Sequence, residues 1–178
     1  MAISQNGYSA LLPTSRYLNT WTVPTTAHTK LRVRTGSAGF LLVHMAAGFD
    51  KKVEDIDFNY QGGKLDDWAH AFRAVRGYSI LSNHASGTAI DLNATEHPLG
   101  VRGTFTEKQI ATIDRRLKIY DGCIRWGGHY SGRVDAMHFE VNRDIAQCER
   151  VARRLMNDTG IGKKIIEANP RQKAVILS

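Results

Sequence analysis

The chain has 178 residues, and its 24 Lys and Arg residues outnumber its 17 Asp and Glu residues, which gives a formal net charge of +7. With 42% hydrophobic and 23% charged residues it can bury a substantial core, which excludes a disordered or fibrous protein, and its length is that of one domain. The positive charge favours polyanionic partners, namely nucleic acid, an anionic lipid surface or the polymers of a bacterial wall.

Local sequence features narrow these classes. The longest apolar run, residues 40–43, is far shorter than the ~20 residues of a membrane-spanning helix, so stable membrane insertion is not expected. No run of five basic residues, glycine-rich phosphate loop or aromatic-basic alternation is present, which argues against nucleic acid. The first residues lack the basic and apolar regions of a classical signal peptide, so we expect a protein that is made and kept in a cytoplasm. Cys123 and Cys148 form no Cys-x-x-Cys pair, and we expect buried free thiols.

The spacing of apolar residues predicts a hairpin and then helices. Alternating apolar and polar residues on either side of a Pro-Thr-Thr turn predict a two-stranded excursion over about residues 17–35. Three later segments have apolar residues at steps of three and four, the period of amphipathic helices. The first runs from Ser37 past Ile56 and ends at Gln61-Gly62-Gly63. The second begins at the capping box of residues 106–109 and runs to Leu117, and the third runs from about Asp144 to Met156. We expect residues 1–160 to form the single domain and residues 161–178 to be a short C-terminal tail.

Between the helices, three segments have the alternation of strands: residues 88–93, 122–126 and 137–142. Because side chains alternate across a strand, Asp91 lies opposite the core-facing Ile90, and His138 and Glu140 lie opposite the core-facing Phe139. Helices alternating with strands and hairpin-like connections predict an α+β domain, with a small, mostly antiparallel sheet flanked by about three helices.

One constellation of side chains points to chemistry. His84 and Asp91 are seven residues apart, and a straight strand would separate them by more than ~20 Å, but a turn at Gly87 would bring them together. His138, on the polar face of its own strand, is a candidate third partner. Two imidazoles and one carboxylate, with a fourth position for water, are typical of a catalytic zinc site. Spacing alone leaves open that the two histidines are ordinary surface or core residues and that Asp91 is a salt-bridged or turn-capping carboxylate.

Two spaced motifs carry a resemblance to a known family: Ser82-x-His84-x-x-Gly87-x-Ala89-x-Asp91 and Asp135-x-x-His138-x-Glu140. They resemble the zinc peptidases of peptidoglycan, which include D-alanyl-D-alanine carboxypeptidases and dipeptidases and the L-alanyl-D-glutamate endopeptidases of phage endolysins. Residues 81–94, 97–100 and 124–128 are similar to endolysin peptidases of phages that infect actinobacteria. The resemblance implies one Zn²⁺ per chain, held by His84, Asp91 and His138 in a cleft on the sheet.

The resemblance also implies a catalytic acid/base, which would be Asp135. Three positions before His138, Asp135 would point to the opposite face of a regular strand, so we expect it in the turn that enters the strand. It would take a proton from the attacking water and deliver it to the departing amine. Glu140 is the second candidate for the base, and it could instead orient an imidazole from behind.

A substrate-binding arginine is implied as well. Arg73, which follows Phe72, matches the family arginine that holds a substrate carboxylate or the developing oxyanion, and Arg76 is the alternative. The remaining implied contacts to substrate or to the ligands are Ser82, Trp126 and His129. The sequence departs from related phage enzymes at two positions, because Ala74 replaces a proline after the arginine and His129 replaces an aspartate after Trp-Gly-Gly.

The function implied is that of a phage endolysin-type metallopeptidase that hydrolyses peptidoglycan stem peptides, with the L-Ala–D-Glu bond as the expected target. Such an enzyme would be a monomer that stays in the host cytoplasm until it is released to the cell wall. Three alternatives remain: a D-Ala-D-Ala carboxypeptidase or dipeptidase, a wall peptidase attached to a phage tail, and a non-catalytic basic module that binds the wall.

Overall fold

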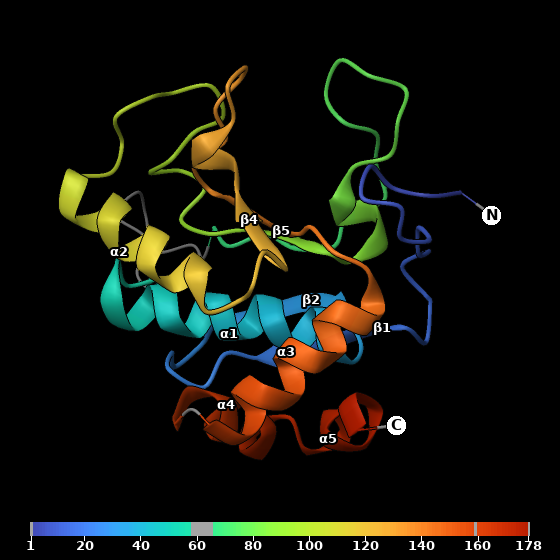
Figure 1. Ribbon diagram of the computed structural model, residues 1–178. Coiled ribbons are helices and arrows are strands. Elements are labelled where there is room, and N and C mark those ends of the chain that lie inside the picture. The colour runs from blue at the N-terminus through green and yellow to red at the C-terminus, as the bar shows by residue number, and fades with distance from the viewer. Residues whose placement is uncertain (1, 58–65, 159, 178) are drawn as a thin grey trace.

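A computed structural model of the protein describes residues 2–57, 66–158 and 160–177. Over these residues the chain forms five α-helices, two short 3-10 helices and two antiparallel sheets, one of two strands and one of three (Figure 1). The predicted α+β class is therefore confirmed. Among the described helices, none has the length and apolar character that a membrane span requires.

The predicted hairpin is present as β1 (Leu18–Thr22) and β2 (Lys30–Arg34), which pair antiparallel with Trp21 opposite Leu31. Trp21, Leu31 and Val33 are completely buried, as the alternation of apolar residues predicts. The hairpin therefore supplies one wall of the core.

The central helix α1 (Ser37–Lys52) is shorter than predicted. The apolar period continues to Ile56, but the helix stops after Lys52, and the Asp50 side chain accepts a hydrogen bond from the Ile56 backbone N–H at 3.3 Å, which stabilises a turn instead. The Gln61-Gly62-Gly63 sequence lies outside the described residues. Residues 37–49 are all buried, so this helix is covered on all sides rather than on one face.

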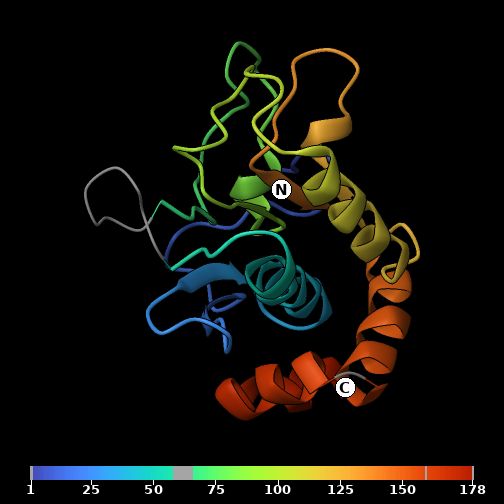
Figure 2. The same cartoon turned by 90° about the vertical axis from the view of Figure 1, so that its left-hand side faces the viewer.

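The covering on the far side of α1 comes from a region that was not expected to fold. Instead of a tail, residues after 160 form α4 (Gly160–Ala168) and α5 (Pro170–Leu177), which follow α3 (Ile145–Asp158). Figure 2 looks along α1 and shows these helices beneath it. Ile165 and Ile176 are buried, and the Asn169 side chain hydrogen-bonds both the N–H and the carbonyl of Thr22 at 2.9 Å. The domain therefore includes the C-terminal helices.

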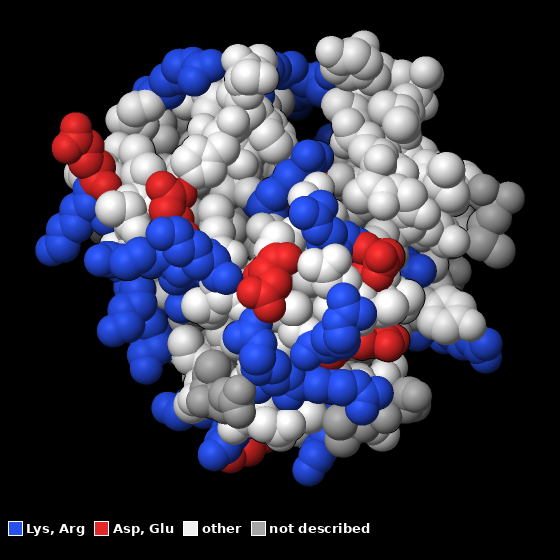
Figure 3. Space-filling view, viewed as in Figure 1, with Lys and Arg blue, Asp and Glu red and all other residues white. Residues whose placement is uncertain are grey.

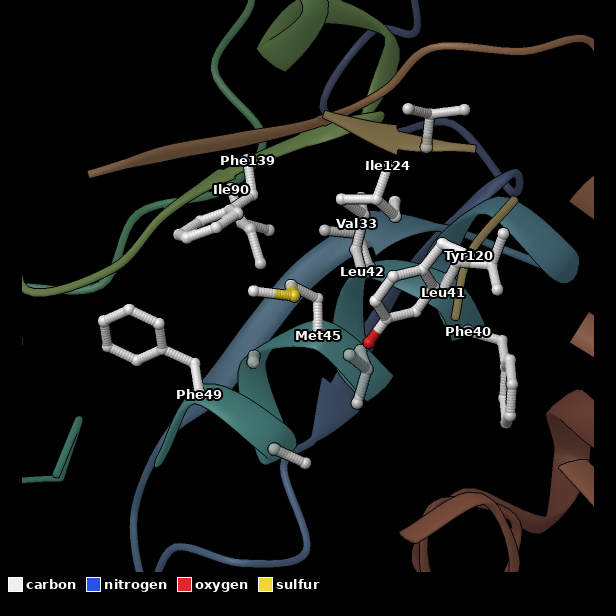
Figure 4. Close-up of a cluster of buried hydrophobic side chains, with 14 of the residues drawn as sticks. Val33, Phe40, Leu41, Leu42, Met45, Phe49, Ile90, Tyr120, Ile124 and Phe139 are labelled. Carbon is white, nitrogen blue, oxygen red and sulfur yellow. The ribbon is translucent and has the colours of Figure 1, made fainter. Parts of the chain in front are cut away.

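The three-stranded sheet lies on the other side of α1. Its order is β3 (Ala89–Asp91), β5 (His138–Val141), β4 (Ile124–Trp126), and both pairs are antiparallel. Ile90 and Phe139 point from the sheet toward Met45 and Phe49 of α1 (Figure 4). Helix α2 (Glu107–Lys118) begins with the predicted capping box, in which Thr106 and Gln109 bond reciprocally. The polar face of the sheet is left to form the site.

Candidate metal centre

The turn that was predicted at Gly87 is present and is made by a short 3-10 helix, η1 (Asn83–Ser86). Ser82 is the N-cap of η1, and its Oγ accepts a hydrogen bond from the His84 N–H at 3.3 Å. Gly87 ends it with φ 67°, and a Cβ there would lie 2.8 Å from the Arg34 backbone nitrogen. Glycine is required both by this dihedral and by this close approach. The turn carries His84 back beside Asp91.

His138 reaches the same point from β5, because it is the cross-strand partner of Asp91. The distance from Asp91 Oδ1 is 3.2 Å to His84 Nε2 and 2.8 Å to His138 Nδ1, and the two nitrogens are 3.2 Å apart. All three residues are buried, and among the described residues they are the group of His, Cys, Asp and Glu side chains that could hold a metal ion. The predicted convergence is confirmed.

The hydrogen bonds that His84 and His138 make outside the cluster bear on which ring nitrogens carry a proton. His84 Nδ1 is 2.6 Å from the Ala69 carbonyl oxygen, which can only accept, so Nδ1 carries the proton and Nε2 presents a lone pair. His138 has a carboxylate oxygen at each ring nitrogen, Glu140 Oε2 at 3.1 Å from Nε2 and Asp91 Oδ1 at 2.8 Å from Nδ1, so without a metal ion both nitrogens can carry a proton.

A metal ion would replace the proton between His138 Nδ1 and Asp91 Oδ1, and the two imidazole nitrogens and the carboxylate oxygen would then form the donor set of a cation site. A tetrahedral zinc site with ligand distances of about 2.0–2.1 Å has ligand–ligand distances of about 3.3 Å, close to the separations found here. The residues present fit zinc.

Within the cluster, carboxylates lie next to imidazoles, and each kind of group shifts the pKa of the other. Burial opposes charge on each group, but the adjacent imidazoles of His84 and His138 hold the pKa of Asp91 well below its ordinary value. Burial likewise opposes a proton on His138, yet its hydrogen bonds to Asp91 and Glu140 prevail and raise its pKa to about 10. The pocket therefore stabilises positive charge at its centre, whether that charge is a proton or a metal ion.

Asp135 lies in the turn that leads into β5, where the His138 N–H donates to the Asp135 carbonyl at 3.1 Å. Two hydrogen bonds to the Trp-Gly-Gly sequence, residues 126–128, fix the backbone around Asp135. The Asp135 N–H donates to the Gly127 carbonyl at 3.0 Å, and Trp126 Nε1 donates to the Ala136 carbonyl at 2.6 Å. Asp135 Oδ1 is buried and has no hydrogen-bond partner among the described residues. Burial raises the pKa of this carboxyl, and the charge on His138 opposes the rise only in part. A carboxyl so placed is suited to acid/base work.

Glu140 is engaged differently, because its carboxylate is fully occupied. Besides His138 it accepts hydrogen bonds from Asn83 Nδ2, from Arg125 Nε and from the Tyr130 hydroxyl, the last at 2.6 Å. Burial would raise the pKa of Glu140, but these donors hold it well below its ordinary value. A carboxylate with four donors is poorly placed to accept a further proton and well placed to fix an imidazole.

The N-terminal segment supports this network. The Asn6 N–H donates to Asn83 Oδ1 at 2.9 Å, which turns the Asn83 Nδ2 toward Glu140. Asn6 Nδ2 in turn donates to the Thr88 hydroxyl and the Val141 carbonyl at 2.8 and 2.9 Å. The segment before residue 10 thus contributes to the surroundings of His138.

The cluster opens into a cleft with a volume of about 460 Å³. The molecule is visibly hollowed at its top, and Lys and Arg atoms lie beside the hollow, apart from those gathered over α2 and α3 (Figure 3). Arg73, Arg76 and Ser82 line this cleft, together with Asp135 and the three clustered residues.

Trp126 and His129 do not line the cleft. Trp126 is buried and stacks on Phe139 in the core, and His129 Nε2 bonds Asp114 of α2 at 2.6 Å.

The segment that carries most of the cleft residues is similar to a known protein family. Residues 76–141 match the family model described as D-alanyl-D-alanine carboxypeptidase. No curated protein and no solved structure gives a match. The carboxypeptidase match supports a zinc peptidase that acts on peptidoglycan peptides, and it carries no information about a phage or an actinobacterial host.

The carboxypeptidase match spans all three clustered residues as well as Asp135 and Glu140, but it begins after Arg73. Three partners of Glu140 were missed in the sequence: Asn83, Arg125 and Tyr130. Only Arg125 had a signal, because alternation in β4 places it on the polar face between two buried neighbours. Asn83 is brought to Glu140 by η1, and Tyr130 by the loop that precedes β5.

Proposed function

We propose that the protein is a phage endolysin-type zinc peptidase that hydrolyses peptidoglycan stem peptides at the L-Ala–D-Glu bond. One observation carries the hydrolase proposal: two imidazole nitrogens and the Asp91 carboxylate face one another in an open cleft that is also lined by Asp135, whose Oδ1 has no hydrogen-bond partner among the described residues. The choice of bond rests on the resemblance of the motifs to endolysin peptidases. A cytoplasmic enzyme awaiting release to the wall, active as a monomer, is part of this proposal.

Zinc held by His84, Asp91 and His138 would supply Lewis-acid chemistry, which acidifies water and polarises the scissile carbonyl. Asp135 is the acid/base: its free oxygen accepts a proton from the attacking water and returns it to the leaving amine. Arg73, exposed on the wall of the cleft, binds a substrate carboxylate or the carbonyl oxygen as negative charge develops there. Glu140 fixes the ring of His138.

The test separates metal binding from catalysis. We expect Asp135→Asn to retain zinc in elemental analysis while hydrolysis falls by about 10²–10⁴-fold, and His84→Ala to lose both. Asp114→Asn, which removes an exposed carboxylate on α2, is the matched control and should change neither. Full activity in Asp135→Asn would move the base to Glu140, and full activity after removal of all metal would refute the metallopeptidase.

The D-alanyl-D-alanine carboxypeptidase match favours a second candidate, the removal of terminal D-Ala. Mass spectrometry of products from purified peptidoglycan distinguishes the two. Peptides that begin with D-Glu indicate the endopeptidase, whereas free D-Ala without a fall in wall turbidity indicates the carboxypeptidase.

A further inference from the structure

The cleft carries arginines on two facing loops. In Figure 1 the loop of residues 72–81 and the loop of residues 127–136 rise on either side of the sheet, and both line the cleft. Arg73 and Arg76 lie on the first loop, and Arg133 lies on the second. Arg125, the fourth arginine of the cleft, is already paired with Glu140.

Three of these guanidinium groups have no acidic partner. Among the described residues, Arg73, Arg76 and Arg133 form no ion pair and no side-chain hydrogen bond, and all three are exposed. Like charges gathered around one cavity repel each other, and an anionic ligand relieves that repulsion. The cleft is therefore suited to a ligand that has negative charge near both loops.

Arg133 is placed to act as an anchor because hydrogen bonds hold the backbone around it, while its own side chain is exposed and forms no ion pair with the described residues. The Gly100 N–H donates to the Val134 carbonyl at 2.8 Å, and Arg102 donates to the Gly132 carbonyl at 3.1 Å. A Cβ at Gly100 would lie 3.9 Å from Arg133 Nε, so the side chain extends over the loop before α2. Its charge also acts on Asp135, since it opposes the burial-driven rise in the pKa of that carboxyl.

We propose that Arg133 is a specificity-determining residue that binds a second substrate carboxylate, across the cleft from the one bound by Arg73 or Arg76. This inference rests on the proposed peptidase function and narrows its substrate class: the enzyme acts on peptides that carry at least two carboxylates, one within reach of each loop. A peptide with a single terminal carboxylate leaves one of the two loops without a counter-charge.

The experiment uses three synthetic stem tetrapeptides with acetylated N-termini: one with both the D-Glu α-carboxylate and the C-terminal carboxylate free, and two in which one or the other is an amide. Loss of a hydrogen-bonded charge pair lowers kcat/KM by about 10- to 100-fold, so we expect the wild type to disfavour both amides by that factor. Arg133→Gln should cleave one of the two amides with the same kcat/KM as the dianionic peptide and should still cleave the other amide with a lower kcat/KM. Arg133→Lys should restore part of the discrimination.

Arg171→Gln is the matched control, because it removes the same charge from an exposed position on α5. It should retain the full discrimination against both amides. If Arg133→Gln discriminates as strongly as the wild type, or if Arg171→Gln loses as much as Arg133→Gln, the proposal is overturned.

Calorimetric binding of the same peptides to Asp135→Asn, with and without Arg133→Gln, separates this inference from the proposed function. Preferential binding of the dianionic peptide that Arg133→Gln abolishes, without hydrolysis by the wild type, would support the inference and refute the peptidase. Hydrolysis of all three peptides at equal rates would support the peptidase and refute the inference. If no peptide is bound or cleaved, both are refuted.

Discussion

The close contact between Gly127 and Asp135 gives a quantitative prediction for Gly127→Ala. A Cβ at Gly127 would lie 2.4 Å from the Asp135 carbonyl oxygen and 3.0 Å from its Cβ. The Asp135 backbone must move by about 1 Å to restore an ordinary contact, which begins at 3.4 Å. The backbone of Gly127 itself is compatible with alanine, because its φ is not positive.

A displacement of about 1 Å at a group that takes part in the reaction costs about 100-fold in rate, or about 2.7 kcal/mol of transition-state stabilisation. We therefore expect kcat of zinc-loaded Gly127→Ala on a stem peptide to fall by about 100-fold. Its zinc content should not change, because the contacts of the added Cβ are with Asp135 rather than with His84, Asp91 or His138.

Gly132→Ala is the control within the same loop, since a Cβ there meets no atom within 4 Å. It should keep wild-type kcat. Wild-type kcat in Gly127→Ala, or an equal loss in both variants, would refute the conclusion that the Trp-Gly-Gly sequence positions Asp135.

Three further predictions concern the metal network and the core. Glu140→Gln should weaken zinc binding by about 10- to 100-fold in competition with a chelator, because His138 loses its charged partner; an unchanged affinity would contradict that role. Burial lowers the pKa of His44 to about 3, below the unfolded value of 6.5, so the unfolded state binds a proton that the native state does not. Urea unfolding should therefore show that the wild type loses about 3 kcal/mol more than His44→Gln between pH 7 and pH 4, whereas parallel losses would contradict the assignment. Asn169→Ala should lower the free energy of unfolding by about 2–3 kcal/mol, because it removes the hydrogen bonds to Thr22, and a change below about 0.5 kcal/mol would show that the C-terminal helices are held otherwise.

Local patterns were sufficient to predict the elements that carry the clustered residues. Gly87 between His84 and Asp91 required a turn, and alternation placed Asp91 and His138 on the polar faces of their strands. Each of these inferences depends on backbone geometry over a few residues, so no distant contact was needed to make it. The capping box at Thr106 was predictable for the same reason.

The C-terminal helices were not predictable by such patterns. Helices of nine and eight residues are marginal alone, so α4 depends on packing against α1 and α3, α5 on packing against α3 and α4, and both on the bonds between Asn169 and Thr22. Those contacts join residues about 150 positions apart, and the sequence near residue 169 has no local pattern that predicts them.

The place of Trp126 was predictable only in part. The resemblance implied a contact to substrate or to the ligands, whereas alternation with Arg125 places the ring on the core face, away from the lining of the cleft. Its Nε1 donates to the Ala136 carbonyl beside Asp135, a contact that depends on the folded turn before β5.

The hydrogen bonds from Asn6 through Asn83 and Glu140 to His138 join the two ends of the catalytic region. A nascent polypeptide, or one trapped midway through collapse, has not yet brought these four side chains together. Such a species lacks the oriented imidazole even when its local His84 turn has formed. Under the proposed peptidase function, hydrolysis would therefore begin only after the tertiary structure is complete, and incompletely folded molecules would leave the peptidoglycan intact.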